Sequence, residues 1–230
     1  MCPAGAPAAI RLRGTAVWTA GSDSETGTAV LEASNAGASR VALTLAGGSR
    51  VEVQSRHGIA PRAAVQASGM PGADGAAHAR KLGDAFTPAA WFYTPLLLGE
   101  LGSGGVTAVN LGAVTIAGAS LDHLRLQRAY PRQTAKIAAE LASLSQADLY
   151  LDPATLLPRR LRFERHPDGN IRQGVPVEIR YRNYKQIDGV TVPGTIERYY
   201  NGTLQLSITI TGADASPQLA ASDFVLGGAQ

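Results

Sequence analysis

The fold is decided by a stretch near the end of the sequence, Leu204-Gln205-Leu206-Ser207-Ile208-Thr209-Ile210-Thr211. Every even-numbered residue in this stretch is aliphatic, and every odd-numbered residue is polar. Successive side chains of a β-strand point to opposite faces of a sheet, so the pattern predicts a strand with one buried and one solvated face. A sheet with one apolar face must cover that face with another part of the protein.

Three earlier stretches alternate in the same way, at residues 160–164, 175–182 and 190–197. Turn signals separate the strands, because Gly and Asn tolerate a positive φ; they are Pro167-Asp168-Gly169-Asn170, Asp188-Gly189 and Asn201-Gly202. Residues 147–226 are therefore predicted to form an antiparallel meander of about five strands.

The first half of the chain is less regular. Four more strands are predicted there, at residues 10–18, 28–34, 40–45 and 50–56. Residues 58–84 are rich in Gly, Ala and Pro without any period, and this composition predicts a long surface loop.

Two segments have helical character. Residues 89–101 follow Thr87-Pro88, which resembles a helix start, and Pro95 is expected to kink or restart this helix. Residues 135–144 carry apolar side chains at helical spacing, although a strand-edge excursion is an alternative.

The chain has 230 residues, of which 45% are hydrophobic, and we expect one domain over residues 1–230. A chain of this size buries about 70% of its unfolded surface and needs neither metal nor disulfides for stability. The fold class is mainly β, with one to three helices. Alternation does not decide between a sandwich or closed barrel and an open barrel curled around the helices, which would leave a cavity.

The charge of the chain excludes some classes of partner. Lys and Arg total 21 against 18 Asp and Glu, a net charge of +3, and no basic run is present, so no nucleic-acid partner is expected. Basic residues alternate with apolar ones, as in Arg160-Leu161-Arg162-Phe163, which indicates a solvated strand face. No stretch reaches the ~18 apolar residues of a transmembrane segment.

No catalytic constellation is visible in the sequence. The four histidines, His57, His78, His123 and His166, lie far apart, without a carboxylate or second histidine at ligand spacing. Asp122 and His123 are neighbours on a strand and would point to opposite faces. We therefore expect no metal, no cofactor and no enzymatic activity.

Cys2 is the only cysteine, so no internal disulfide can form. The start of the chain lacks the basic and apolar regions of a signal peptide, as expected if a signal had been removed. Cys2 is then either an ordinary thiol, which we favour because no lipobox precedes it, or the acylated first residue of a lipoprotein anchored in the outer membrane.

Three motifs in order resemble a known family. They are Asp152-Pro153-Ala154-Thr155-Leu156-Leu157-Pro158, then Tyr184-Lys185-Gln186-Ile187-Asp188-Gly189-Val190-Thr191-Val192-Pro193, and finally Ser222-Asp223-Phe224-Val225-Leu226. Together they are similar to the "D-P-x-T-x-L-P", "Y-x-x-x-D-G-x-x-x-P" and "x-D-F-x-L" patterns of LolA/LolB-like lipoprotein-sorting proteins. The similarity covers about residues 121–226. Residues 58–84 have no counterpart in the family, and the cavity arginine of the carriers has no assigned position here.

The resemblance implies a curved antiparallel sheet that forms an open half-barrel under a helical lid, in a periplasmic protein. It also implies a hydrophobic cavity for a lipid or for the acyl chain of a lipoprotein. The cavity and lid residues would be Trp91, Phe92, Leu97, Leu161, Phe163, Val177, Ile179, Val192, Ile196, Leu206 and Ile208. The alternatives are a permanently packed helix at residues 89–101, and an envelope sensor or assembly subunit that binds a protein partner with the same fold.

Overall fold

The computed structural model describes residues 7–57, 60–70, 73–80, 86–99, 101, 105–167 and 169–226. The strands of the first half are β1 Ala9–Ala20, β2 Asp23–Ser34, β3 Ser39–Leu45, β4 Gly48–His57, β5 Ala60–Ser68, β6 Ala77–Arg80, β7 Val106–Ile116 and β8 Ala119–Arg128. Those of the second half are β9 Ala147–Leu151, β10 Pro158–Arg165, β11 Val175–Arg182, β12 Lys185–Ile187, β13 Val190–Val192, β14 Thr195–Tyr200 and β15 Thr203–Asp214. The helices are α2 Thr94–Gly99, α3 Ala135–Leu144 and a 3₁₀ turn, η2 Ala221–Phe224.

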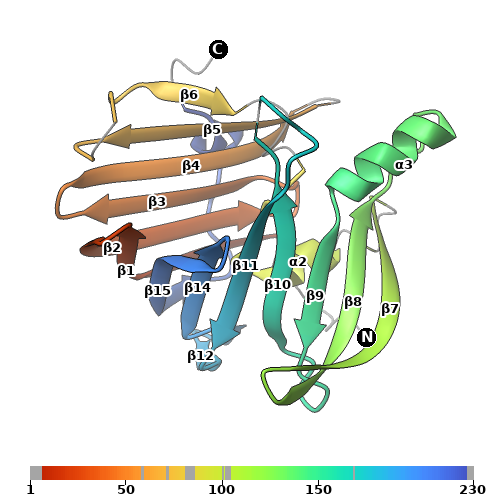
Figure 1. Ribbon diagram of the computed structural model, residues 1–230. Coiled ribbons are helices and arrows are strands. Elements are labelled where there is room, and N and C mark those ends of the chain that lie inside the picture. Colours follow the sequence, from red (N-terminus) through yellow and green to blue (C-terminus); the bar gives the residue numbers. More distant parts are fainter. Residues whose placement is uncertain are drawn as a thin grey trace.

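A single antiparallel sheet dominates the fold. Its 13 strands follow the order β6-β5-β4-β3-β2-β1-β15-β14-β11-β10-β9-β8-β7, and β12 and β13 form a separate hairpin. The end strands β6 and β7 do not pair with each other, so the sheet stays open. Figure 1 shows β3–β5 running almost at right angles to β8–β11, with α2 inside the curve. The predicted fold class, a curved antiparallel half-barrel with few helices, is confirmed.

The alternation that predicted the meander is confirmed in β15. Leu206, Ile208 and Ile210 are at most 1% exposed, whereas Thr209 between them is exposed. Ile208 lies opposite Ala16 of β1 on one side and Ile196 of β14 on the other. The last strand of the chain therefore pairs with the first at the centre of the sheet.

Two of the predicted turns are also confirmed, whereas Asp168 of the third, at residues 167–170, lies outside the described residues. Asp188 and Gly189 have positive φ values of 48° and 79°, and Asn201 and Gly202 have 46° and 79°. These pairs close tight hairpins, because only Gly, Asn and Asp adopt such angles readily. In the Asp152-Pro153 turn, the Asp152 carboxylate accepts hydrogen bonds from the Ala154 and Thr155 amides, both at 3.0 Å.

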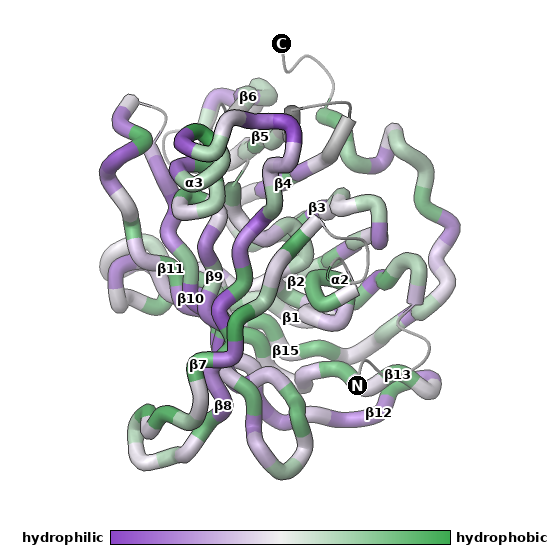
Figure 2. The backbone as a smooth tube through the Cα atoms, turned by 90° about the vertical axis from the view of Figure 1, so that its right-hand side faces the viewer, coloured by the Kyte–Doolittle hydropathy of each residue, from purple (hydrophilic) through white to green (hydrophobic). Residues whose placement is uncertain are grey.

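One short stretch covers the apolar face of the sheet. We call residues 86–99, which include α2, the covering segment. Its apolar side chains join strand residues from both halves of the sheet in one core: Ala90, Trp91, Phe92, Tyr93, Leu96 and Leu97. Figure 2 places α2 inside the curve of the sheet, surrounded by strands.

The helix predicted over residues 89–101 begins later than predicted. Residues 89–92 form turns, and α2 begins at Thr94 with Pro95 as its second residue. Proline lacks an amide N–H and clashes inside a helix, but it fits the first turn, where amides have no helical partner. Pro95 therefore lies in the first turn of the helix and neither kinks nor restarts it, and Trp91 and Phe92 lie outside it. The helix predicted at residues 135–144 is confirmed as α3, none of whose residues is buried.

The predicted loop over residues 58–84 is also wrong in the part of this range that the structure describes, which leaves out residues 58–59, 71–72 and 81–84. Strands β5 and β6 occupy much of this range, and β5 pairs with β4 over its whole length. Ala63, Ala64 and Val65 of β5 are buried. Alanine has a low β-propensity, so a strand rich in alanine is hard to recognise from the sequence. Its small side chain also needs little surface to pack against at the margin of a sheet. The strand is therefore imposed by pairing with β4.

The hairpin of β7 and β8 was not predicted from alternation, and its exposure explains why. Most of β7 is exposed on both faces, with Val109 and Leu111 53% and 46% exposed. A strand that buries neither face has no reason to alternate apolar and polar residues. β7 forms one margin of the sheet, and Val106 at its start packs against the core.

The alternation in β15 leads to a stability prediction. Ile208→Ala should lower the free energy of unfolding by about 2–5 kcal/mol, because it opens a cavity in the core. Thr209→Ala, on the neighbouring solvated position, should cost less than about 1 kcal/mol. Urea unfolding followed by circular dichroism measures both, and equal losses would contradict the assignment of faces.

Candidate functional site

The structure brings together the residues predicted to line the cavity and its lid. Ten of them belong to the buried core: Trp91, Phe92, Leu97, Leu161, Val177, Ile179, Val192, Ile196, Leu206 and Ile208. Phe163 is partly buried and packs against this core. The strand residues lie on the concave face of the sheet, and those of the covering segment pack onto them. With the segment in place, this face is filled by protein side chains.

The covering segment is attached through backbone carbonyls. The Tyr181 hydroxyl of β11 donates a hydrogen bond to the Trp91 carbonyl, and Gln54 Nε2 of β4 donates to the Thr87 carbonyl at 3.0 Å. Burial raises the pKa of the Tyr181 phenol well above its ordinary value, so the hydroxyl stays protonated and donates. These contacts come from opposite halves of the sheet and fix the segment between them.

A cavity opens at the edge of the covering segment. Its volume is about 430 Å³, and Phe92, Tyr93 and Pro95 of the segment form one wall. The lining also includes Tyr181 of β11, Tyr184 just before β12, and Val190 of β13. This volume falls within the ~300–1,000 Å³ of small-molecule pockets.

A buried ion pair lies on the same concave face, on the side of β4 and β14. Arg198 Nη1 and Nη2 donate to the two Glu52 oxygens at 3.1 and 3.3 Å, and Arg50 Nε donates to Glu52 at 2.8 Å. The Arg198 side chain is 3% exposed and that of Glu52 is 21% exposed. A bidentate pair of this kind fixes the relative position of two strands from different halves of the sheet.

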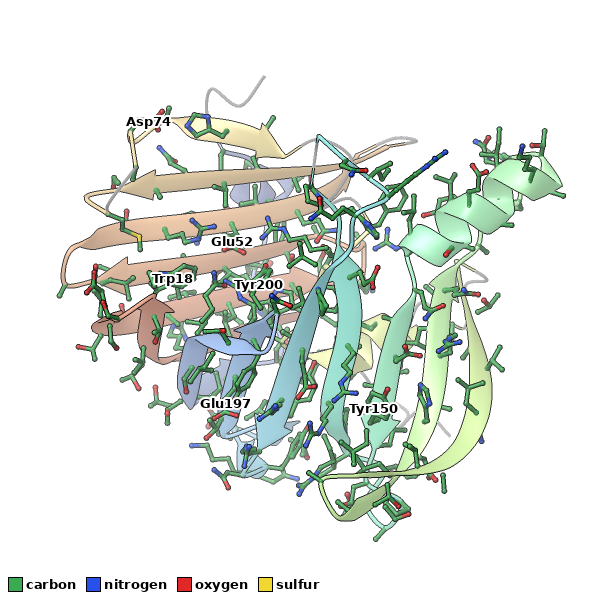
Figure 3. The ribbon with its side chains drawn as sticks, viewed as in Figure 1. Trp18, Glu52, Asp74, Tyr150, Glu197 and Tyr200 are labelled. Carbon is green, nitrogen blue, oxygen red and sulfur yellow. The ribbon has the colours of Figure 1, made fainter. Side chains whose placement is uncertain are left out.

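Aromatic rings surround the Arg198 guanidinium. It lies 5.1 Å from the ring centre of Trp91, 5.5 Å from that of Tyr200 and 5.7 Å from that of Trp18. Figure 3 shows Trp18, Glu52 and Tyr200 grouped together, well apart from Tyr150. Ring faces attract cations, so the three rings partly replace the water that Arg198 has lost.

The local field keeps Glu52 ionised. Burial by itself would raise its pKa, but the charges of Arg198, Arg50 and Arg165 and the Arg198 hydrogen bond outweigh burial and hold the pKa well below its ordinary range. Burial would also lower the pKa of Arg198, but the Glu52 charge outweighs this and raises it. Both partners therefore carry their charges at neutral pH.

The outer, convex face carries a second set of charges. Glu178 accepts hydrogen bonds from Arg160 at 2.9 Å and Arg162 at 2.6 Å, and also from Arg180. The solvated strand face predicted from the alternating arginines is confirmed, since Arg162 is 42% exposed. A groove of about 510 Å³ lies beside this face, near the end of α3, but its lining includes charged side chains such as Asp148, Arg162 and Glu178.

Two histidines expected to lack partners have them. His123 Nε2 lies 2.9 Å from Asp148 Oδ1 of β9, and His78 Nε2 lies 2.9 Å from Asp74 Oδ1. Asp148 is 25 positions from His123, and strand pairing that brings the two together is not visible in sequence spacing. The side chain of His57 and all of Cys2 lie outside the described residues, so the two expectations for Cys2 stand as stated.

Within the described ranges, no group of three His, Cys, Asp or Glu side chains is placed to hold a metal ion. In the same part of the chain, no helix has the length and apolar character to cross a membrane.

The buried ion pair leads to a pH-dependent prediction. Glu52→Gln should lower the free energy of unfolding by about 3–5 kcal/mol at pH 7, because it leaves Arg198 buried without a counter-charge. The pKa of Glu52 is lowered by folding, so its contribution is present above the ordinary value of 4.5 and is lost as pH falls below it. The difference between wild type and variant should therefore shrink below about pH 4.5 in urea unfolding series.

A matched control is Glu178→Gln, which removes a carboxylate that also pairs with several arginines. Those arginines are more exposed than Arg198, so the loss should be about 1 kcal/mol or less. Equal losses for the two variants at pH 7 would contradict the special role of the buried pair.

The chain was compared with known proteins. No protein-family model matches it, and none of the curated proteins matches it in sequence. Solved structures do match over almost the whole chain. An outer membrane lipoprotein-sorting protein domain from Vibrio parahaemolyticus is 12% identical, with a TM-score of 0.54 over 96% of this chain and 90% of that one.

Two further structures match to a similar degree. A DUF1329 family protein from Desulfovibrio piger is 12% identical, with a TM-score of 0.56 over 97% of this chain and 92% of that one. A LolA superfamily protein from Nitrosomonas europaea is 12% identical, with a TM-score of 0.51 over 95% and 90% of the two chains. The resemblance seen in the motifs is thus confirmed in three dimensions, and the chain has the fold of the LolA-superfamily and lipoprotein-sorting structures.

Proposed function

We propose that this protein is a periplasmic carrier or binding protein for a lipid, or for the acyl chain of a lipoprotein. The ligand would lie on the concave face of the sheet, in space that the covering segment occupies in this structure. The observation that carries the proposal is the 430 Å³ cavity, which is lined by residues of the covering segment, of β11 and of the β12–β13 hairpin.

The proposal requires the covering segment to open. Its only α-helix, α2, has six residues, and helices this short are marginal without tertiary support. Tyr181 and Gln54 donate hydrogen bonds to its backbone carbonyls, at Trp91 and Thr87. A segment with little helix of its own is a candidate for local opening without global unfolding.

Once the covering segment opens, the concave face of the sheet would supply the binding energy for the ligand. Leu161, Ile179 and Ile208 are completely buried beneath the segment and present aliphatic surface. Each CH₂ group of an acyl chain gains about 0.8 kcal/mol when it leaves water. A lipid can therefore replace the apolar side chains of the covering segment without any catalytic group.

The proposed location rests on the fold. One similar structure is described as an outer membrane lipoprotein-sorting domain, which is a bacterial envelope function. A carrier of this kind works between the membranes.

Leu97→Asp tests whether the covering segment borders a ligand site. Leu97 is 8% exposed in the core. An uncharged probe, N-phenyl-1-naphthylamine, should bind wild-type protein with a rise in fluorescence. The variant should bind it at least about tenfold more weakly, because a carboxylate in an apolar pocket loses its hydration without a partner.

Ile137→Asp is the control, since Ile137 of α3 is 44% exposed and should tolerate the charge. Melting temperatures are measured in parallel. A Leu97→Asp protein that melts much earlier but binds the probe normally would favour a permanently packed core segment. Wild-type protein that binds neither the probe nor lipid would remove the carrier proposal.

A second candidate function is binding of a protein partner in the envelope, as a sensor or assembly subunit. The exposed strand β7 favours it. This strand forms one margin of the sheet, contains no charged residue, and exposes Val109 and Leu111. Edge strands without charges or proline offer their free backbone groups for pairing with another chain.

A further inference from the structure

A small pocket lies beside the Arg198–Glu52 pair on the concave face. Its volume is about 50 Å³, and its lining includes Glu52, Trp91, Arg165, Arg198 and Tyr200. One water molecule takes up about 30 Å³ in the liquid, so this pocket has the size of a small polar group. Its lining is mixed, because apolar side chains such as Val53 and Phe163 lie beside these polar ones.

Guanidinium groups gather around this pocket. Arg198 and Arg50 both bond to Glu52, and the charge of Arg165 acts on the same carboxylate. Two guanidinium groups, those of Arg198 and Arg50, thus share one carboxylate. Charges removed from water are unfavourable unless they are paired, so this part of the concave face favours an added anion.

The Arg198 side chain also has an unused donor. Its Nε atom is buried and has no hydrogen-bond partner among the described residues, although both Nη atoms bond to Glu52. Buried N–H groups in proteins are almost always satisfied, and an exception calls for a specific explanation. A ligand atom that accepts a hydrogen bond would satisfy the Nε donor of Arg198.

The covering segment places an aromatic ring over this charge. The Trp91 ring centre is 5.1 Å from the Arg198 guanidinium, and Trp91 also lines the pocket. If the segment moves, Arg198 loses this cation–π contact but keeps Trp18 and Tyr200, which belong to β1 and β14. An anion in the vacated position would pair with Arg198 in place of the ring.

We propose that the pocket beside Arg198 and Arg165 binds the acidic head group, a carboxylate or phosphate, of an apolar ligand whose chain lies on the concave face. This inference rests on the proposed function and makes it more specific. It predicts that the protein distinguishes an anionic lipid from a neutral one with the same chain.

The test compares dodecanoate with 1-dodecanol, which share their alkyl chain and differ in charge. Both are titrated by displacement of N-phenyl-1-naphthylamine, and inorganic phosphate is titrated as a head group without a chain. Wild-type protein should bind dodecanoate at least about tenfold more tightly than dodecanol, as expected for hydrogen bonds to a charged acceptor. Inorganic phosphate should displace no probe and bind far more weakly than dodecanoate.

The variants Arg198→Met and Arg165→Met should each lower the dodecanoate-to-dodecanol affinity ratio by about tenfold. Arg165→Met leaves the Arg198–Glu52 pair intact, so it tests the site even if Arg198→Met does not fold. Arg182→Met is the matched control, because Arg182 is 55% exposed and pairs with Glu197.

The outcomes separate the two proposals. An affinity ratio that stays the same in both pocket variants overturns the head-group site and leaves the carrier proposal standing. If inorganic phosphate binds as tightly as dodecanoate, the site binds a free anion, and the head-group proposal is overturned as well. Wild-type protein that binds neither dodecanoate nor dodecanol overturns the proposed function and, with it, this inference.

Discussion

The apolar concave face of the sheet must be covered, and the rest of the structure depends on how this is done. A sheet of 13 strands with one aliphatic face exposes far more apolar surface than a short helix such as α2 can bury. Curvature solves part of the problem, because the two halves of the sheet turn toward each other around α2 (Figure 1). The covering segment covers the apolar surface that curvature leaves exposed. The same feature that stabilises the fold therefore creates the candidate site.

Much of this fold is predictable from alternation and turns. The strand of residues 204–211 and the turns at Asp188-Gly189 and Asn201-Gly202 are local features, and the structure has them where they were expected. Strands β5 and β7 were missed for physical reasons. β5 is built from small residues beside a partner strand, and β7 buries neither face, so neither carries the pattern of a half-buried strand.

The apolar part of the candidate site was predictable in the same way, since alternation assigns Leu161, Ile179 and Ile208 to one face. The charged part was not. Glu52 and Arg198 are 146 positions apart and meet only because the sheet curls. The alternating pattern is also misleading here, because Arg198 takes a position on the apolar face between Ile196 and Tyr200. Only pairing with Glu52 and stacking on aromatic rings make that position tolerable.

The two proposals depend on a common event, which is movement of the covering segment away from the sheet. Its attachments join both halves of the molecule, through Gln54 on β4 and Tyr181 on β11. A ligand that takes its place would have to restore the apolar contacts of Phe92 and Leu97. It would also have to restore the contact of Trp91 with Arg198.

Amide hydrogen exchange measures that event most directly. The amides of Tyr93 and Leu96, which bond within the covering segment, should exchange by local opening, well before those of Leu206 and Ile208 in the central strand. Added dodecanoate should change the exchange of the segment and leave the central strand unaffected. Amides of the segment that exchange only with global unfolding, at the same rate with and without dodecanoate, would contradict the account.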